Sequence, residues 1–363
     1  MAAARTFDGF VAPGYEPVRD AFAAQPSGGS ALAVRRHGEP VVDLREGWSD
    51  AAQTRPWGSE TLVNVYSVGK PVIALAVLLL VDRGLVGLDD PIARHWPRFT
   101  TDASVRHLLT HTAGLPFFPV PRDPSAWRDW DLLCADLAAA SPEWPPGTVA
   151  AEHALTYGHL LGELVRRVDG RPPARFVAEE IAGPWRLDFG FGVAEPARCA
   201  ELEFDRPDRP GLLLGEPGSV HARALENPAG PLDLAVLNSD LWRRAAVPAV
   251  NLHATADSLA RFYSGLLAGG VLDGHRLLGA SLVADLVSAH FTGPDLFIGQ
   301  DTTWGLGVQI EPDGTWGMGG LGGNAAWADP ATGHAIAYAT RRIGDFDRVS
   351  ALDTAISSLR PLT

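Results

Sequence analysis

The chain has 363 residues, of which 46% are hydrophobic and 20% charged, and its mean hydropathy is close to zero. This composition is typical of a globular protein with a large core and excludes collagen-like and low-complexity chains. The formal net charge is −13 and no basic block occurs. This excludes a nucleic-acid-binding protein, which needs positive charge to bind the phosphate backbone.

Membrane, secretion and metal-binding signals are weak. The longest apolar run, 72–81, is shorter than the about 20 residues of a membrane-spanning helix. An acid at Asp8 and the lack of a following apolar stretch argue against a secretory signal. Cys134 and Cys199 fit neither a disulfide framework nor a metal knuckle, and we expect both to be buried thiols. We therefore expect a cytoplasmic protein without membrane, metal or cofactor, whose oligomeric state the sequence leaves undetermined.

The hydrophobic pattern predicts strands at both ends of the chain and helices between them. A hairpin is expected over 31–36 and 40–45, with a turn at His37-Gly38. Helical patterns then follow over 71–83, 126–139, 156–169, 173–182 and 254–268. The segment 183–250, rich in Pro, Gly and Arg, has weak periodicity and is expected to run over the surface. Strands are expected over 304–310, 324–328 and 334–340, and a closing helix over 349–359.

One lysine stands out. The chain holds 29 arginines and a single lysine, Lys70. Arginine supplies charge but cannot give up a proton, so a lysine kept in this background is a candidate for proton chemistry. Lys70 follows Ser67 by three residues, and at the start of a helix these positions share one face.

This spacing predicts a nucleophile and its partner. A helix N-terminus offers free amides that favour a developing oxyanion at Ser67. Burial disfavours the ammonium form of Lys70, which makes the amine a base near neutral pH. The plainer alternative is a capping serine followed by a lysine whose amine reaches solvent.

Five segments, in order along nearly the whole chain, resemble one family: Thr61–Lys70, Leu85–Pro91, Val105–Leu115, Thr156–Gly170 and Gly320–Pro330. The chain resembles the serine β-lactamase and penicillin-binding-protein superfamily, closest to its class-C-like carboxylesterase branch. The resemblance implies an α+β fold, in which an antiparallel sheet of N- and C-terminal strands is flanked by helices and packed on a helical lobe. It implies a single catalytic domain with an α/β lobe over about 1–65 and 250–363, a helical lobe over about 66–249, and the site between them.

The same resemblance implies roles for site residues. Ser67 is the expected acylated nucleophile and Lys70 its activating partner. The oxyanion hole is expected from the amides of Ser67 and Leu321, the residue just after the third family motif.

The second family motif is altered. Relatives have a tyrosine ahead of the helix at 156–169, whereas this chain has Glu152-His153. His153 titrates near neutrality and is a candidate to move the serine proton. Glu152 is a candidate base acting through water, and its carboxylate would favour the charged form of Lys70. Tyr157, the only tyrosine nearby, is a third candidate, although its position suits packing.

The third motif is altered too. Met318-Gly319-Gly320 replaces a motif that carries a cation in relatives, which argues for a substrate without a carboxylate there. The alternative for Met318 is plain packing. Gly320 and Leu321 are expected beside the substrate. Other signals are weaker: His107 and His111 have metal-pair spacing but no third ligand, and no Gly-x-Ser-x-Gly elbow occurs.

The sequence therefore predicts a serine hydrolase that cleaves small neutral esters or amides through an acyl-enzyme on Ser67. An acyltransferase or other biosynthetic enzyme of the same fold is the first alternative. A catalytically weakened binding protein is the second. The expected partner is a small-molecule substrate, and neither nucleic acid nor membrane.

Overall fold

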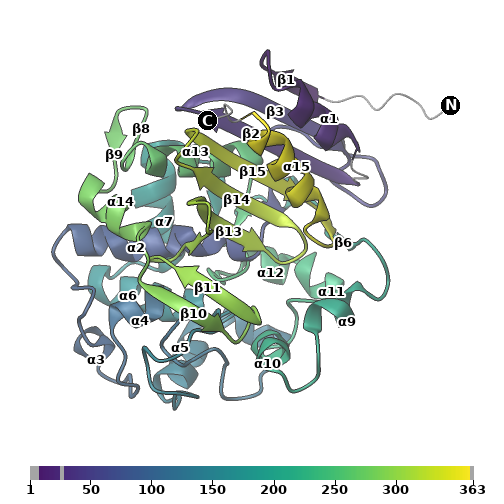
Figure 1. The fold of residues 1–363 in the computed structure, drawn as a ribbon. Coiled ribbons are helices and arrows are strands. Elements are labelled where there is room, and N and C mark those ends of the chain that lie inside the picture. The colour runs from purple at the N-terminus through teal and green to yellow at the C-terminus, as the bar shows by residue number, and fades with distance from the viewer. Residues whose placement is uncertain (1–7, 25–27, 360–363) are drawn as a thin grey trace.

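An antiparallel sheet runs from β1 at the top of the view down to β10 in the computed structural model, which describes residues 8–24 and 28–359 (Figure 1). In these residues its nine strands lie in the order β1 (Asp8–Val11), β3 (Glu39–Gly47), β2 (Gly29–Arg36), β15 (His334–Thr340), β14 (Asn324–Asp329), β13 (Trp316–Gly320), β12 (Gln309–Ile310), β11 (Gln300–Trp304) and β10 (Phe291–Asp295). Strands from the two ends of the chain thus form one sheet, as expected.

The expected N-terminal hairpin is confirmed as β2 and β3. Its turn places both His37 and Gly38 at positive φ, 49° and 91°, the conformation that matches the twist of paired strands. Strand β2 then pairs with β15 from Ser30↔Thr340 to Arg36↔His334. Its side chains alternate between two separate apolar clusters, so both faces of the sheet are covered.

Helices cover the two faces. On one face, α1 (Glu16–Ala24) and α15 (Asp347–Ser357) lie side by side (Figure 1). They bury Val18, Phe22, Leu352 and Ile356 against the sheet. On the other face, α13 (Ala256–Leu267) packs on β2, β14 and β15. The sheet is therefore the middle layer of three.

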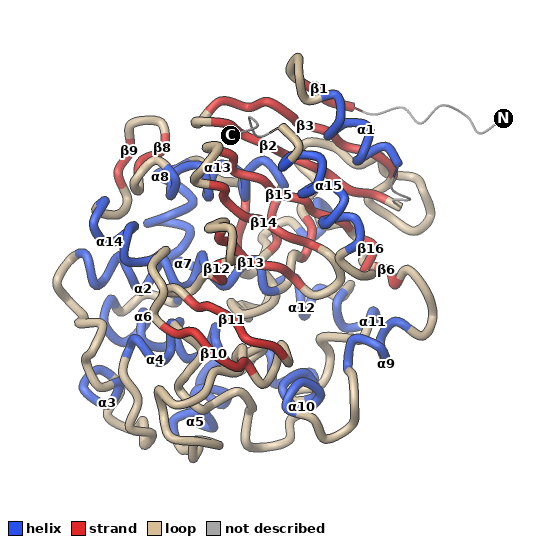
Figure 2. Tube along the Cα trace, viewed as in Figure 1, coloured by secondary structure: helices blue, strands red, loops and turns tan. Residues whose placement is uncertain are grey.

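The helical half is built around α2 (Lys70–Asp82), in which every residue from Lys70 to Leu80 is buried. An all-apolar helix of this kind is stable only at the centre of a core. Helices α6 (Tyr157–Asp169) and α7 (Pro173–Val177) pack directly on it, and Figure 2 shows these helices gathered to the left of β13. The remaining helices here are α3 (Ile92–His95), α4 (Val105–Leu109), α5 (Trp130–Ala138) and α8 (Gly183–Trp185).

The segment expected to run over the surface holds short elements joined by loops. Its helices are α9 (Arg209–Leu214), α10 (Val220–Glu226), α11 (Leu234–Leu237) and α12 (Asp240–Arg244). Short strands tie it to the rest of the chain: β4 (Val63–Asn64), β5 (Phe189–Gly190) and β7 (His253–Ala254) in one sheet, and β6 (Glu203–Phe204) and β16 (Arg342–Ile343) in another. A small hairpin, β8 (Val271–Leu272) and β9 (His275–Arg276), and α14 (Ala280–Leu286) follow α13.

Three expectations need correction. The stretch 304–310 is not one strand, because Gly307 has a φ of +94° and separates β11 from β12. The helix expected over 126–139 is split at Asp129, where a 3-10 turn ends and α5 begins. The helix expected over 173–182 ends at Val177 and continues as one π turn over Ala178–Ala182.

The expectation about an N-terminal signal concerns residues 1–7, which lie outside the described residues. Within 8–24 and 28–359, none of the helices has both the length and the hydropathy that a membrane span requires.

Candidate active site

Ser67 opens a 3-10 turn over Ser67–Gly69 that leads directly into α2. The preceding residue, Tyr66, has a φ of 50°, which is strained for a residue with a side chain. The Tyr66 hydroxyl donates to the carbonyl of Pro231 at 3.2 Å, which holds this conformation. The strained residue turns the chain sharply, so that Ser67 stands at the N-terminal end of the buried helix.

Lys70 is completely buried, and its ammonium faces only oxygen atoms. Its Nζ lies 2.7 Å from Ser67 Oγ and 2.8 Å from Glu152 Oε1. It also donates to the carbonyls of Ala154 and Ala249 at 3.2 Å each. Burial lowers the pKa of Lys70 below its ordinary 10.5, and the Glu152 carboxylate opposes that shift. This set of acceptors suits the ammonium form, which has three N–H groups to donate.

Glu152 completes the group of three. The Ser67 hydroxyl donates to Glu152 Oε1 at 3.0 Å, so the carboxylate contacts the serine directly, whereas the sequence had suggested contact through water. The side chain is 9% exposed and reaches Ser67 from the segment before α6. Ser67, Lys70 and Glu152 therefore contact one another pairwise.

His153 is not brought to Ser67, contrary to one of the sequence-based candidates. Its Nδ1 lies 2.7 Å from the carbonyl of Ala151, and its Nε2 accepts from the amide of Leu115 at 3.2 Å. Burial lowers the pKa of His153 to about 4. It is a neutral imidazole whose two nitrogens both bind main-chain groups, so it is not placed to move the serine proton.

Tyr157 is also turned away from the nucleophile. Its hydroxyl donates to the carbonyl of Leu109 at 3.1 Å, and its ring stacks on His111 at 4.3 Å. Complete burial raises the pKa of Tyr157 well above 10, so the phenol stays protonated. The structure places this residue in the core, where it packs α6 against α4.

The third motif lies on β13, which packs against the Ser67 turn. A Cβ on Gly320 would lie 2.2 Å from the carbonyl oxygen of Val65, so only glycine permits this close approach. Leu321 follows and lines the same cavity as Ser67. Among the residues the structure describes, the Ser67 and Leu321 amides donate to no carbonyl or side chain, as an oxyanion hole requires.

Met318 does not line the cavity beside Ser67. It is 4% exposed and packs with Ala150 and Trp304 in a small apolar cluster. Strand alternation turns its side chain away from the cavity that Gly319 lines. Its role in the structure is packing, the second of the two readings that the sequence allowed.

The cavity beside Ser67 has a volume of about 240 Å³ and a mostly apolar wall. Its wall consists of Tyr66, Ser67, Glu152, Ala154, His221, Leu225, Pro231, Val250, Phe297, Ile298, Gly319, Leu321 and Phe346. In this wall, Glu152 has an acidic side chain and His221 a basic one. No lysine or arginine lines it, so the described wall offers no cation to a carboxylate.

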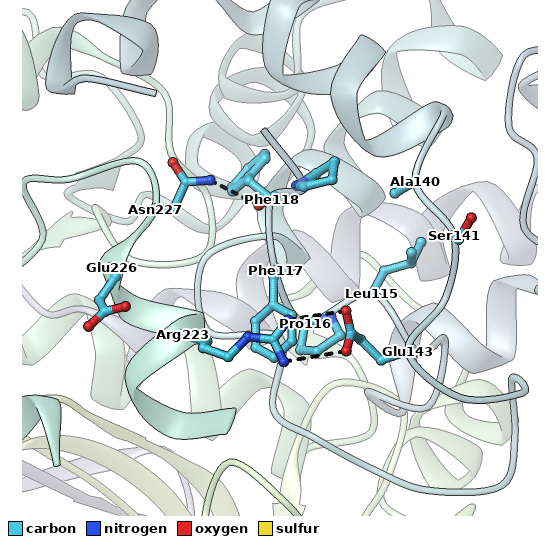
Figure 3. Close-up of a pocket in the computed structure, with 12 residues that line it drawn as sticks. Leu115, Pro116, Phe117, Phe118, Ala140, Ser141, Glu143, Arg223, Glu226 and Asn227 are labelled. Atoms are coloured by element: carbon cyan, nitrogen blue, oxygen red, sulfur yellow. Dashed lines mark hydrogen bonds and ion pairs between the residues drawn. The ribbon is translucent and has the colours of Figure 1, made fainter. Parts of the chain in front are cut away.

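A second cavity of about 310 Å³ lies on another side of α10 (Figure 3). There the Arg223 guanidinium lies over the ring of Phe117, 3.9 Å from its centroid, and pairs with Glu143 at 3.2 Å. Ser67 is not part of its wall. Helix α10 presents His221 and Leu225 to the Ser67 cavity and Arg223 to this one, so the helix separates the two spaces.

The histidines and cysteines of the described residues do not gather into a metal site. In the described part of the chain, no three His, Cys, Asp or Glu side chains gather as ligands. His107 accepts the amide of Ser104 at a helix cap, and His111 accepts the amide of His153. Cys134 and Cys199 are free and buried, as expected.

The sheet covered by helices and the Ser-x-x-Lys pair at the head of a buried helix define a β-lactamase/transpeptidase-like architecture. The chain matches the Beta-lactamase family over residues 7–359, and it belongs to that family. This confirms the family and fold that the sequence had suggested.

Several relatives are named esterases. The chain is 33% identical over 342 residues to Esterase/beta-lactamase LipL of Mycobacterium tuberculosis, a match that covers 89% of this chain and 79% of the relative. Esterase EstB of Burkholderia gladioli is 35% identical over 204 residues, which cover 50% of this chain and 52% of EstB.

Solved structures agree over nearly the whole chain. The structure of a family VIII carboxylesterase superposes with a TM-score of 0.88 at 31% identity, covering 98% of this chain and 100% of that one. A penicillin-binding protein homolog from Caulobacter crescentus gives a TM-score of 0.85 at 32% identity, with the same coverage.

Proposed function

We propose that this chain is a serine hydrolase that cleaves small neutral esters through an acyl-enzyme on Ser67. One observation carries the proposal: Ser67 Oγ lies 2.7 Å from Lys70 Nζ and 3.0 Å from Glu152 Oε1, at the wall of an apolar cavity. The esterase names of the relatives support the same reaction class.

In the acylation step, Ser67 Oγ attacks the ester carbonyl carbon and passes its proton to the Glu152 carboxylate. Lys70 remains an ammonium and stabilises the negative charge that develops on Oγ. The carbonyl oxygen becomes an oxyanion that accepts from the amides of Ser67 and Leu321. When the carbon–oxygen bond to the alcohol breaks, Glu152 returns the proton to the leaving alcohol.

In the deacylation step, a water molecule attacks the acyl carbon and gives its proton to Glu152. The same two amides stabilise the second oxyanion. The bond to Ser67 Oγ then breaks, the carboxylic acid leaves, and Oγ recovers a proton from Glu152. The carboxylate that Glu152 brings to the site thus acts as base and acid in turn, and the atoms balance over the cycle.

The cavity wall supports a neutral substrate. The described wall carries no lysine or arginine, and the Glu152 carboxylate would repel a second negative charge close to Ser67. A cytoplasmic location is part of this proposal. The two cysteines are free and buried, and a reducing compartment such as the cytoplasm keeps cysteines as thiols.

The test compares two variants on p-nitrophenyl acetate. Ser67→Ala should abolish turnover, and Glu152→Gln, which keeps the shape but cannot take a proton, should lower kcat by at least about a hundredfold. Tyr157→Phe is the matched control, since this neighbouring buried group donates only to Leu109. We expect Tyr157→Phe to keep kcat within about twofold and to lose about 1 kcal/mol of stability.

Intact-mass measurement separates the steps. Wild-type protein mixed with the activated ester should carry one acyl group, and the Ser67→Ala protein should carry none. Full turnover by Ser67→Ala would contradict the acyl-enzyme, whereas full turnover by Glu152→Gln alone would move the base function to Lys70.

A further inference from the structure

A second buried acid, Asp295, contacts the main chain of Glu152. It ends strand β10, and its side chain is 1% exposed. Neither the family motifs nor the proposed reaction uses it. A carboxylate at this depth needs hydrogen-bond donors around it.

Four donors surround this carboxylate. Oδ1 accepts from the main-chain amides of Glu152, Phe297 and Ile298 at 3.1, 2.9 and 3.0 Å. Oδ2 accepts from the indole Nε1 of Trp304 at 3.0 Å. Every partner is a donor, so the arrangement suits an ionised carboxylate, which only accepts.

These bonds join the base to the cavity wall. The amide of Glu152 belongs to the residue that contacts Ser67, while Phe297 and Ile298 line the cavity. The neighbouring amide of Leu296 donates to the carbonyl of Ala150 at 2.9 Å. The turn after β10 is thereby fastened to the chain before α6 at two adjacent points.

Hydrogen bonds hold both neighbours of Glu152, from the Ala151 amide to the His111 carbonyl at 3.2 Å and from the His153 amide to His111 Nδ1 at 3.0 Å, whereas the amide of Glu152 itself donates to Asp295. Residues 139–156 before α6 form neither helix nor strand, so local structure does not fix where the Glu152 main chain lies. A base must lie within hydrogen-bond reach of the proton it takes, and a shift of about 1 Å can cost about a hundredfold in rate.

We infer that Asp295 is a positioning residue, whose carboxylate holds the main chain of Glu152 so that the Glu152 carboxylate reaches Ser67 Oγ. This inference rests on the proposed function. It makes one demand that a merely structural acid does not: Asp295 should matter to catalysis only while Glu152 can act as a base.

The experiment is a double-mutant cycle of Asp295→Ala and Glu152→Gln, followed by kcat and KM on p-nitrophenyl acetate. Asp295→Ala should lower kcat by about a hundredfold. In the Glu152→Gln background it should change kcat by less than about threefold, because the group it positions is already disabled.

Asp329 offers a matched control. It is another buried carboxylate, 4% exposed, that accepts the amides of Ala331 and Thr332 in the turn between β14 and β15. This turn lies at the end of β14 away from Leu321. Asp329→Ala should lower the melting temperature but leave kcat within about twofold of wild type.

A second variant keeps the test decisive if Asp295→Ala does not fold. Asp295→Asn keeps one acceptor oxygen but turns an N–H₂ group toward the indole N–H of Trp304, so two donors meet. We expect kcat to fall about tenfold and to recover severalfold when Trp304→Phe removes the opposing donor.

The outcomes separate this inference from the proposed function. Suppose that Glu152→Gln is inactive. If a folded Asp295→Ala protein, or failing that Asp295→Asn, then keeps kcat within twofold of wild type, the inference is overturned. An equal loss from Asp295→Ala in both backgrounds also overturns it. An active Glu152→Gln instead refutes the assignment of the base itself.

Discussion

At the scale of single residues, the charge on Lys70 decides how Ser67 is activated. A lysine without solvent needs oxygen acceptors for its protons, and Lys70 has four within 3.2 Å. Burying the Lys70–Glu152 ion pair costs desolvation energy. Its presence beside a nucleophile therefore indicates a catalytic role rather than a contribution to stability. Because Ser67 donates directly to Glu152, the proposed mechanism assigns the carboxylate as the base and the ammonium as a fixed positive charge.

This arrangement predicts the alkaline side of the pH–rate profile. Burial lowers the pKa of Lys70 from 10.5, and the ammonium is the active form. As the pH rises through the lowered pKa, the ammonium is lost, so kcat should fall with a midpoint below 10.5. The measurement is kcat for phenyl acetate from pH 7 to 10.5, after subtraction of the Ser67→Ala rate.

The opposite slope would contradict this assignment. A rate that keeps rising through the alkaline range would mean that the neutral amine is the active form, with Lys70 as the base. The sequence left both possibilities open, because the Ser-x-x-Lys spacing is the same for either.

The sequence predicted the contact between Ser67 and Lys70 because their relation is local, three residues apart at a helix start. It did not decide between Glu152 and His153, since adjacent residues in an irregular segment point in different directions that only tertiary contacts fix. It gave no sign of Asp295, which contacts Glu152 from 143 residues further along the chain and has no marking motif.

At the scale of elements, the proposed oxyanion hole depends on the close approach of the main chains of strand β13 and the Ser67 turn. Gly320 stands where a Cβ would meet the carbonyl oxygen of Val65 at 2.2 Å and Val68 Cγ2 at 3.1 Å. A Cβ on the neighbouring Gly319 would lie 3.1 Å from the ring of Phe346, and Phe346 is 43% exposed, so its side chain can move aside.

This contrast predicts different effects of the same change at adjacent positions. Gly320→Ala should push β13 away from the Ser67 turn, displace the Leu321 amide and lower kcat at least about tenfold. Gly319→Ala should lower kcat less than about threefold, because only a side chain must move. Kinetics on p-nitrophenyl acetate and thermal unfolding check both variants, and equal kcat losses would show that β13 is not held by this contact.

Elements with strong local signals were predictable. Their own periodicity and turn residues predict these elements: the hairpin of β2 and β3, the helices α2, α6, α13 and α15, and the strands β14 and β15. The strands β1 and β10 were missed, because an edge strand such as Phe291–Asp295, with Gly293 and Pro294 in it, lacks the usual alternation and gains its conformation from its partner. The split of β11 from β12 depends on a glycine backbone conformation that composition does not reveal.

At the scale of the whole molecule, the core contains several neutral histidines. His111, His153, His159 and His253 are at most 2% exposed. Burial lowers the pKa of His153 and His253 to about 4 and that of His159 to about 3. Each is ordinarily protonated below 6.5 in the unfolded chain.

These lowered pKa values predict that acid destabilises the fold. Below pH 6.5 the unfolded state binds protons that the folded state does not, so stability falls as the pH falls toward about 4. At pH 5 each of the three histidines should cost about 2 kcal/mol relative to pH 7. The sum, about 6 kcal/mol, is a large part of the 5–15 kcal/mol of a typical domain, so urea midpoints should drop steeply between pH 6.5 and 5.

The cleanest single test is His159→Phe. The ring of His159 stacks on Trp130 at a centroid distance of 4.6 Å and meets Phe118 edge-on at 5.4 Å, so phenylalanine keeps the aromatic packing while removing the titrating group. Between pH 7 and pH 5, the free energy of unfolding of this variant should fall by about 2 kcal/mol less than that of the wild-type protein. Phe118→Leu, which alters the same cluster without a titrating group, should lose stability equally at both pH values. If His159→Phe shows the same acid loss as the wild-type protein in urea unfolding, the acid sensitivity must come from groups other than the buried imidazole of α6.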